Sequence, residues 1–385
     1  MPVNNLITPI FSQELAGIII EGFLYINYNM NAADVIISTI NKKGPISFRD
    51  FMEIALYHPE YGYYTSAGDK IGQNGDFYTS PFVTSAFGQM IAKQIMEMWE
   101  QLNVSEFTIV EYGAGTGILC RDIVNYIKTN IQSDKHLNYF IIEISPSLRE
   151  TQAAIVPAGV KWVNSINEMK PFAGCVLSNE VVDNFPVHQV YMEKELKELY
   201  IDHTEFFKEV LQPASTSLCE YLDQLNISLP EGAKAEINLD AIQWLKDIST
   251  VLQKGFVLTI DYGNAAASLY QRSQGTLACY HKHQRNYCPY INIGSQDITT
   301  HVNFSALKHW GIKNGLQYSG YTSQTYFLLG MGLTNEYRQG ETNNSPTNFL
   351  KTFLLEMGSR LKVLIQHKGF IPNPLSGLKF PLAAL

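Results

Sequence analysis

The stretch 107–117, Phe-Thr-Ile-Val-Glu-Tyr-Gly-Ala-Gly-Thr-Gly, constrains the fold more than any other part of the chain. Its β-branched and aromatic residues predict a buried strand that ends in Glu111, and the apolar periodicity of 118–127 predicts a helix. Glycines stand between the two elements because such a turn visits positive φ and brings backbone close to a ligand. A strand, a glycine turn and a helix in this order are typical of the entrance to a nucleotide-type pocket.

The glycine loop departs from the two common phosphate-binding patterns. A dinucleotide fingerprint has its third glycine where this chain has Ile118, and the Gly-Lys-Ser/Thr of a P-loop is missing. The stretch 94–119 also has no basic residue that could pair with a pyrophosphate. These residues favour S-adenosylmethionine, a nucleoside with a zwitterionic amino acid. The alternative for the loop taken alone is an ordinary strand-to-helix turn.

Polar residues also follow two further predicted strands. The strand 139–142 ends in Glu143, which is 26 residues beyond Gly117. An acidic residue at the end of the second strand accepts hydrogen bonds from ribose hydroxyls in Rossmann-like folds, although a solvated strand-end glutamate is the alternative. A third strand, 175–178, leads into Asn179, Glu180 and Asp183. Parallel strands present polar groups at their carboxyl ends, so the pocket is expected there; the alternative for 179–188 is a surface loop.

With these segments the chain resembles the class I methyltransferases of the MidA type, a family that includes the mitochondrial assembly factor for respiratory complex I. The matching segments lie in family order between about residues 44 and 305. They are 44–52, 61–64, 75–81, 87–88, 111–117, 179–188, 260–263, 275–277 and 297–304.

The resemblance implies an α/β fold: a Rossmann-like sheet with helices on both faces, an N-terminal helical lobe and an inserted or C-terminal α+β lobe. It implies S-adenosylmethionine as cofactor and, in the mitochondrial member, an arginine of a complex I subunit as methyl acceptor. The residues expected to bind the cofactor are Gly75, Asp76, Ser80, Pro81, Glu111, Gly113, Ala114, Gly115, Gly117, Glu143, Ile144 and Asn179.

An arginine acceptor places a demand on the site, because a guanidinium is protonated at neutral pH and is a poor nucleophile. Carboxylates are needed to align its fork and hold its charge. We expect Glu180 and Asp183 to be the catalytic carboxylates, with Asp261 and Asp297 as second choices. The histidines His188, His283 and His301 are candidate general bases, and Tyr61, Tyr63 and Tyr64 could line a substrate groove; a structural role is the alternative for all six.

One departure from the family bears on the acceptor. The family commonly has Glu after the Ser-Pro of segment 75–81, where this chain has Phe82. A small-molecule methyltransferase and a non-enzymatic assembly factor that retains the fold therefore stand as alternatives. The substrate protein and the number of methyl groups added do not follow from the sequence.

Composition narrows the partners. A net charge of −8 without a lysine or arginine run argues against nucleic acid as a binding partner. The sequence has no run of 18 apolar residues, so no membrane-spanning helix is predicted. Five scattered cysteines without a CxxC pair indicate free thiols and no metal. The protein partner is expected to be the substrate, and a homodimer is possible. The expected location is cytoplasmic in a bacterium, or the mitochondrial matrix in a eukaryote, although residues 1–41 contain no basic residue of a presequence.

Apolar periodicity predicts the remaining elements. Helices are expected at 31–40, 47–56 with Ser47 as N-cap, 84–102, 238–253 and 346–366; strands at 256–260 and 317–329; and a charged hairpin at 193–198. The expected parts are an upstream arm (1–29), the N-terminal lobe (30–105), the core (106–190 and 236–330), an insertion (191–235) and a C-terminal helical segment (331–385).

Overall fold

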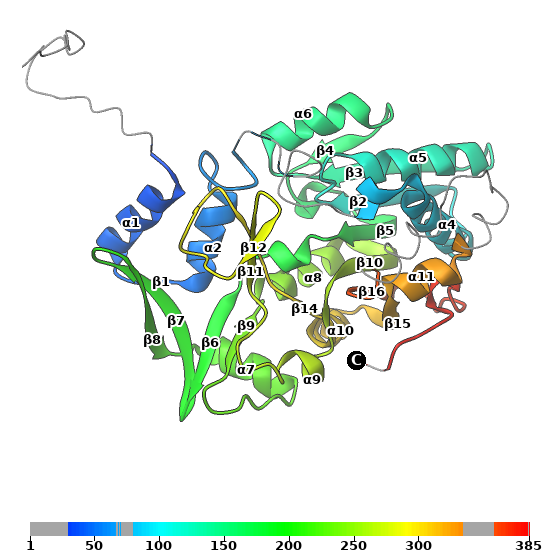
Figure 1. The fold of residues 1–385 in the computed structure, drawn as a ribbon. Helices are drawn as coiled ribbons and strands as arrows, with labels where there is room; N and C mark the ends of the chain where they lie inside the picture. Colours follow the sequence, from blue (N-terminus) through cyan, green and yellow to red (C-terminus); the bar gives the residue numbers. More distant parts are fainter. Residues whose placement is uncertain (1–29, 67, 69, 71–79, 334–357, 384) are drawn as a thin grey trace, which may run out of the picture. The chain divides into compact units, whose positions relative to one another are not determined.

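The computed structural model describes residues 30–66, 68, 70, 80–333, 358–383 and 385. Its main feature is a sheet in the order β15-β16-β10-β5-β2-β3-β4, in which β14 also pairs with β10 (Figure 1). The strands of this sheet are β2 (Glu106–Tyr112), β3 (His136–Ile142), β4 (Lys161–Val163), β5 (Phe172–Asn179), β10 (Leu252–Asn264), β14 (Val302–Asn303), β15 (Gln317–Ser323) and β16 (Leu361–Lys368).

The five strands β4, β3, β2, β5 and β10 are parallel to one another. The chain leaves β2 towards β3 and β4, and then returns to the other side of β2 as β5. Ligands bind beyond the carboxyl ends of the strands at such a switch point. Strand β16 is antiparallel to both of its neighbours, β10 and β15.

Alternate residues of the central strands point to opposite faces of the sheet, as the strand period of two requires. Val110, Val176 and Val257 join one apolar cluster, whereas their neighbours Ile109 and Leu177 join the other. Helices α8 (Asp240–Val251) and α10 (Phe304–Lys313) pack on the first face; α4 (Ser85–Leu102), α5 (Ile118–Asn130) and α11 (Gln324–Gly330) pack on the second. The expected α/β fold with helices on both faces is therefore confirmed.

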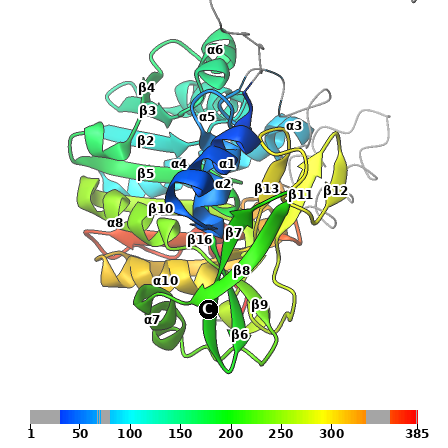
Figure 2. The same ribbon diagram turned by 90° about the vertical axis from the view of Figure 1, so that its left-hand side faces the viewer.

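An antiparallel sheet accompanies the main sheet, in the order β1-β7-β6-β9 with β8 on β7 (Figure 2). Its strands are β1 (Ile46–Ser47), β6 (His188–Glu193), β7 (Glu195–His203), β8 (Phe207–Pro213) and β9 (Lys234–Ile237). Helices α1 (Ala32–Lys43) and α2 (Phe48–Tyr57) pack against it through a third apolar cluster. The expected hairpin at 193–198 is the β6–β7 turn, but Glu198 is buried instead of solvated.

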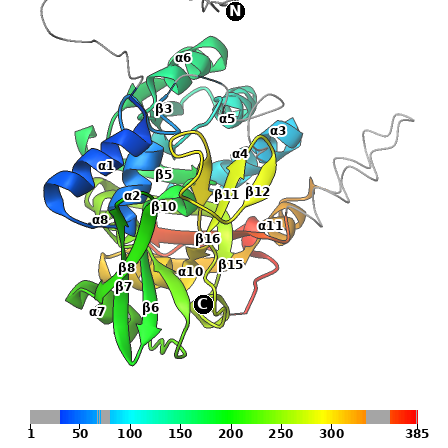
Figure 3. The same cartoon turned by 60° about the vertical axis from the view of Figure 1, so that its left-hand side comes forward.

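A small third sheet, β12-β11-β13, lies beside α2 (Figure 3). It is built from β11 (Ala278–His281), β12 (Gln284–Asn286) and β13 (Asp297–Thr299). The other elements are α3 (Ser80–Val83), α6 (Pro146–Ile155), α7 (Thr216–Gln224), α9 (Ala266–Leu269) and the 3-10 turns η1 (Ile166–Glu168), η2 (Val182–Asn184) and η4 (Ser376–Leu378).

Most of the predicted elements are present. Helices α1, α2, α4 and α8 and strand β10 occupy their expected positions, and Ser47 caps α2 by accepting from the Asp50 N–H at 3.1 Å. The strand predicted at 317–329 is right as far as residue 323 and wrong beyond it, because helix α11 begins at Gln324.

The helix predicted at 346–366 is wrong over 361–366. Those residues belong to β16, which lies between two strands and makes ladder hydrogen bonds on both sides. Val363 and Ile365 join one apolar cluster and Leu364 joins the other, so this stretch is buried on both faces of the sheet. The C-terminal segment is therefore not helical there. The rest of that helix, 346–357, and the upstream arm 1–29 lie outside the described residues. The division of the chain into a core and lobes stays a prediction.

Candidate active site

A cavity of about 420 Å³ lies at the switch point between β2 and β5. Small-molecule pockets commonly range over about 300–1,000 Å³, so the cavity is large enough for a ligand of nucleoside size. Its wall comes from the ends of β2, β3 and β5, from the segments that follow them, and from α2 and the start of α8. The lining residues used below are Glu53, Tyr57, Tyr64, Pro81, Glu111, Tyr112, Gly113, Ala114, Gly115, Thr116, Glu143, Ile144, Asn179, Glu180, Val181, Asn184 and Asp240.

The glycine loop forms one wall, and its conformation explains its glycines. Gly113, Gly115 and Gly117 have φ values of 59°, 54° and 86°, a region that side chains rarely occupy. A Cβ atom on Gly113 would also lie 3.0 Å from Cγ2 of Val181 in the opposite wall. The loop is tied to β3 by the Gly113 N–H, which donates to the Ile142 carbonyl at 2.9 Å. Gly117 is the N-cap of α5, so this wall follows directly from one strand–turn–helix unit.

Two buried carboxyl groups belong to this wall. Glu111 is 2% exposed and accepts a hydrogen bond from the Tyr139 hydroxyl at 2.7 Å; burial raises its pKa to about 7. Glu143 accepts from the Ser145 N–H and from Nε2 of Gln152, both at 3.0 Å, and burial raises its pKa as well. Nε2 of Gln152 also donates to the Gly115 carbonyl at 2.8 Å, so the end of β3 and the glycine loop are fixed to each other.

The opposite wall begins where β5 ends. Oδ1 of Asn179 is buried without a hydrogen-bond partner among the described residues, while its Nδ2 donates to Oε1 of Glu180 at 3.2 Å. The backbone N–H of Ser80 donates to the same oxygen at 3.2 Å. Burial raises the pKa of Glu180 to about 7. Glu180 has a φ of 55°, and a left-handed residue that is not glycine, here lining a cavity, is often functional.

Further carboxylates support this wall from behind. Asp261 is fully buried, and its Oδ2 accepts from the N–H groups of Val181 and Val182 at 3.1 and 2.8 Å. Asp183 is also buried, with Oδ1 unpartnered among the described residues; burial and the nearby Asp261 raise its pKa well above its usual range. Asp297 accepts from the Tyr64 hydroxyl and from Nδ2 of Asn184, both at 2.9 Å.

Nine of the predicted site residues line the cavity: Pro81, Glu111, Gly113, Ala114, Gly115, Glu143, Ile144, Asn179 and Glu180. Three predicted residues are adjacent to it instead of in its lining. Ser80 donates to Glu180, Gly117 caps α5, and Asp183 is a buried residue of the turn η2 that follows Glu180. Gly75 and Asp76 lie outside the described residues. The roles expected of all these residues stay predictions.

Sequence reasoning missed the contribution of α2 and α8. Glu53 and Tyr57 of α2 and Asp240 of α8 line the cavity. Tyr57 donates to the Asn184 carbonyl at 3.1 Å, which joins α2 to the turn behind Glu180. The helical spacing of Glu53 and Tyr57, opposite the apolar face of Phe51 and Met52, was a usable signal.

The tyrosines and histidines that the sequence suggested as further site residues differ in whether they line the cavity. Tyr64 lines the cavity, whereas Tyr61 and Tyr63 do not. None of the three candidate histidines is in the lining. Nδ1 of His188 lies 2.6 Å from Oε1 of Glu198, and burial lowers the pKa of His301 to about 4.

Two kinds of feature are absent from the residues that the structure describes. Among these residues, no group of three or more His, Cys, Asp or Glu side chains has the arrangement of a metal site. No described helix combines the length and the apolar character that crossing a bilayer requires.

A switch-point cavity with a glycine loop defines the Rossmann-like class of cofactor-binding proteins. The sequence model of a family described as "Putative S-adenosyl-L-methionine-dependent methyltransferase" matches residues 90–322. This match spans more than half of the chain, and the protein belongs to that family. The resemblance inferred from the sequence segments is thereby confirmed.

Known structures and curated proteins agree with this family. A crystal structure from Burkholderia thailandensis, bound to S-adenosyl-homocysteine, has a TM-score of 0.82 and 29% identity, and covers 91% of this chain and 95% of that one. The mitochondrial protein arginine methyltransferase NDUFAF7 homolog of Drosophila melanogaster is 25% identical over 88% of this chain and 85% of its own length. The human protein arginine methyltransferase NDUFAF7 is 24% identical over 76% of this chain and 71% of its own.

The protein is therefore a methyltransferase that uses S-adenosylmethionine. The cavity residues fit this cofactor on three counts. The unpartnered Oδ1 of Asn179 is an acceptor for an ammonium group, and the glycine loop leaves backbone open where a Cβ would intrude. The buried carboxyl group of Glu143 suits ribose hydroxyls.

Proposed function

We propose that the protein transfers a methyl group from S-adenosylmethionine to an arginine of a protein substrate, of the kind found in respiratory complex I. The observation that carries the proposal is Glu180, a carboxyl group in the cavity wall opposite the glycine loop, with Asp183, Asp261 and Asp297 buried behind it. A neutral small molecule has no need of so much negative charge, whereas a guanidinium does. The names of the curated relatives point to the same acceptor class.

In this proposal Glu143 and the glycine loop hold the nucleoside and amino-acid parts of the cofactor, and Asn179 accepts from its ammonium group. The bound cofactor supplies an electrophilic methyl group on a positively charged sulfur. Ile144, at 51% one of the more exposed large apolar residues, offers a platform for the adenine. Pro81, from α3, lines the same cavity, and Ser80 is adjacent to it. Gly75 and Asp76 are proposed to bind the cofactor as well.

Glu180 receives the acceptor. Burial holds its pKa near neutrality, and an entering guanidinium lowers that pKa again because opposite charge favours the ionised form. The carboxylate then aligns the planar fork and holds its charge. It is also the group within reach to take the proton that the attacking nitrogen must lose. Asp183 lies in the turn 181–184 that follows Glu180, and an entering guanidinium would favour its ionised form in the same way, against the burial that raises its pKa.

The test is methyl transfer from labelled S-adenosylmethionine to a lysate that lacks this protein, followed by mass spectrometry of the labelled species. We expect methylarginine in a protein band. Glu180→Gln should lower that labelling by about 100-fold or more, since one oxyanion-type contact contributes 10²–10³ in rate. Asp183→Asn should lower it less, while calorimetry shows cofactor affinity retained in both variants.

The matched control is Glu193→Gln, an exposed glutamate at the β6–β7 turn, which should leave labelling unchanged. Label on a lipid or metabolite would replace the arginine proposal with the small-molecule alternative. Full labelling by Glu180→Gln would overturn the role given to Glu180. Cofactor binding without any transfer would favour an assembly factor that keeps the pocket.

A further inference from the structure

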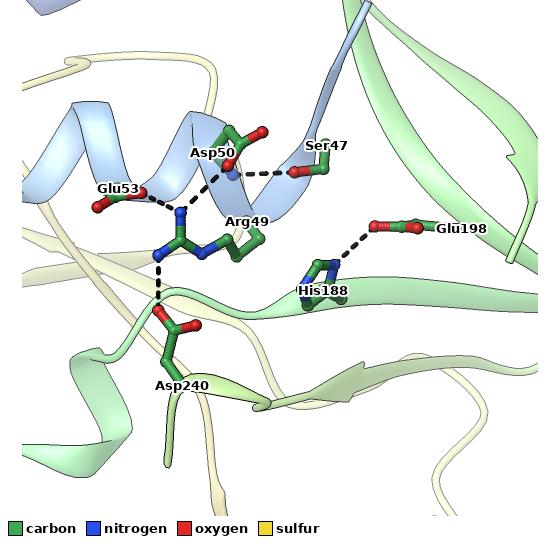
Figure 4. Close-up of polar contacts among 7 residues, drawn as sticks. All are labelled: Ser47, Arg49, Asp50, Glu53, His188, Glu198 and Asp240. Carbon is green, nitrogen blue, oxygen red and sulfur yellow. Dashed lines mark hydrogen bonds and ion pairs between the residues drawn. The ribbon is translucent and has the colours of Figure 1, made fainter. Parts of the chain in front are cut away.

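Arg49, on the first turn of α2, joins the helix to the main sheet's side of the cavity (Figure 4). Its Nη2 donates to Oδ2 of Asp240 at 2.8 Å, across 191 residues of sequence. Its Nη1 donates to Oδ1 of Asp50 at 3.1 Å and to Oε2 of Glu53. One guanidinium therefore holds three carboxylates from two elements that are distant in sequence.

Two of these three carboxylates are cavity residues. Glu53 and Asp240 both line the cavity, and Asp50 does not. Glu53 and Tyr57 follow Arg49 at intervals of four residues, so the three share one face of α2. The contact between Arg49 and Asp240 therefore fixes the helix face that closes the cavity, and it fixes Tyr57 against the turn after Glu180.

The start of α2 is anchored elsewhere. Ile46 and Ser47, just before α2, pair with Ile201 and Tyr200 of β7 in the antiparallel sheet. The neighbouring His188–Glu198 pair also belongs to that sheet, and Figure 4 draws no contact from it to Arg49. The Arg49–Asp240 contact is thus an ion pair that connects α2 to α8. The side chains of Arg49, Asp240 and Glu53 are 25%, 33% and 48% exposed to solvent, respectively.

We infer that Arg49 is a positioning residue for the methyl transfer: by pairing with Asp240 it holds α2 as the wall of the cofactor cavity, and so sets cofactor affinity. The inference rests on the proposal that this cavity holds the cofactor. Arginine suits the task because its rigid fork satisfies several carboxylates at once, which a lysine ammonium does less well. Without it, Glu53 and Asp240 would face each other as unneutralised charges in the cavity wall.

Calorimetric binding of S-adenosyl-homocysteine to the full chain tests this inference. Arg49→Ala and Asp240→Ala should each weaken binding about fivefold, the scale of one partly exposed ion pair within a network. The double variant should bind no more weakly than the weaker single variant, because the two residues act as one unit. Asp50→Asn is the matched control: it removes a partner of the same guanidinium outside the cavity, and binding should stay unchanged.

Chemical rescue supplies a readout that a general loss of stability would not give. Millimolar guanidinium chloride should restore the affinity of Arg49→Ala but not of Arg49→Ala/Asp240→Ala, with sodium chloride at equal ionic strength as control. Single variants that bind like the wild type, or equal rescue of the double variant, would overturn the inference. If Arg49→Ala does not fold, Asp240→Ala with Asp50→Asn carries the comparison. A wild type that binds cofactor but methylates no arginine would reject the acceptor proposal and leave this inference standing.

Discussion

The two walls of the cavity are built in different ways. The wall on the side of β2 and β3 comes from a short continuous stretch of chain, residues 106–152, in which each turn follows directly from the strand before it. The opposite wall is assembled from the end of β5, the start of β13, the end of β10 and helix α2, which are far apart in sequence. The first wall depends on backbone conformation at glycines, and the second depends on buried carboxylates held by distant partners.

The difference predicts which property each wall controls. Changes in the glycine wall should alter cofactor binding first, and so should changes at Asn179 or on α2. Changes in the carboxylates of the second wall should alter transfer to the acceptor while the cofactor still binds. Val181 connects the walls, since its side chain meets Gly113 and its N–H donates to Asp261. If a change in one wall alters both cofactor binding and transfer to the acceptor, coupling through Val181 is the simplest explanation.

The largest effect is expected from Gly113→Val. A branched side chain at a φ of 59° is strained, and its Cβ would press on Val181, so cofactor affinity should fall by about 100-fold or more. Gly159→Val is the control, because Gly159 has a φ of 98° with open space around it and lies outside the cavity. Calorimetry of both variants should show a binding loss only for Gly113→Val; equal losses would mean that the glycine wall has no special role.

Asp261→Asn should lower transfer to the acceptor while leaving cofactor binding nearly unchanged. The two carboxylate oxygens serve different donors: Oδ2 accepts from the N–H groups of Val181 and Val182, and Oδ1 accepts from the N–H of Tyr262. An amide has one oxygen, so its NH2 group must face one of these two sets of donors, which shifts the turn that positions Glu180. We expect arginine methylation to fall about 30-fold, the rate equivalent of ~2 kcal/mol, with cofactor affinity within about threefold. Asp223→Asn, exposed on α7, is the control. A matching loss of cofactor affinity would show that the walls form a single unit.

Acceptor transfer should also depend on pH through Glu180. Its pKa is raised to about 7, and only the ionised form holds a guanidinium, so kcat/KM for the acceptor should rise with pH. Between about pH 6 and about pH 8 the increase should approach tenfold, following the fraction of free enzyme that is ionised. An activity profile that is flat over this range would reject Glu180 as the titrating group.

The smallest effect is expected from Tyr64→Phe. It removes the hydroxyl that donates to Asp297, while Nδ2 of Asn184 still donates to the same oxygen. A loss of about 1 kcal/mol predicts a threefold to sixfold rise in KM for the acceptor with cofactor affinity unchanged. Tyr287→Phe, which removes an exposed hydroxyl at 67% exposure, provides the control for that measurement. A tenfold loss of cofactor affinity would instead assign Tyr64 to the glycine wall.

The same division explains how much the sequence could predict. The strand, loop and helix of 107–127 and the acidic end at Glu143 follow from local patterns, and all of these elements are present where expected. Helix α2 was predicted too, yet its polar face could not be assigned to the cavity. That face reaches the site through contacts between segments that are distant in sequence, the pairing of β1 with β7 and the contact of Arg49 with Asp240.

Local patterns failed where burial on two sides decides the structure. The apolar content of the stretch 361–366 is typical both of a buried helix and of a central strand. Periodicity alone does not distinguish these two structures in so short a stretch. Its neighbours β10 and β15 make it a strand. The position of Asp183 also could not be predicted from local patterns: it was grouped with Glu180, but it is buried outside the cavity lining, and the N–H groups of its turn donate to Asp261. Its role stays a prediction.

The position of β16 has a consequence for how the protein forms during synthesis. A nascent chain that has not yet reached residue 361 contains β10 and β15 with the ladder edges that β16 later occupies still open. Exposed strand edges with apolar side chains are prone to pair with other chains, and contacts between distant segments form slowly. Strand β16 is thus flanked on both sides by strands that are synthesised before it, and this part of the sheet is completed only after residues 361–368 have emerged from the ribosome.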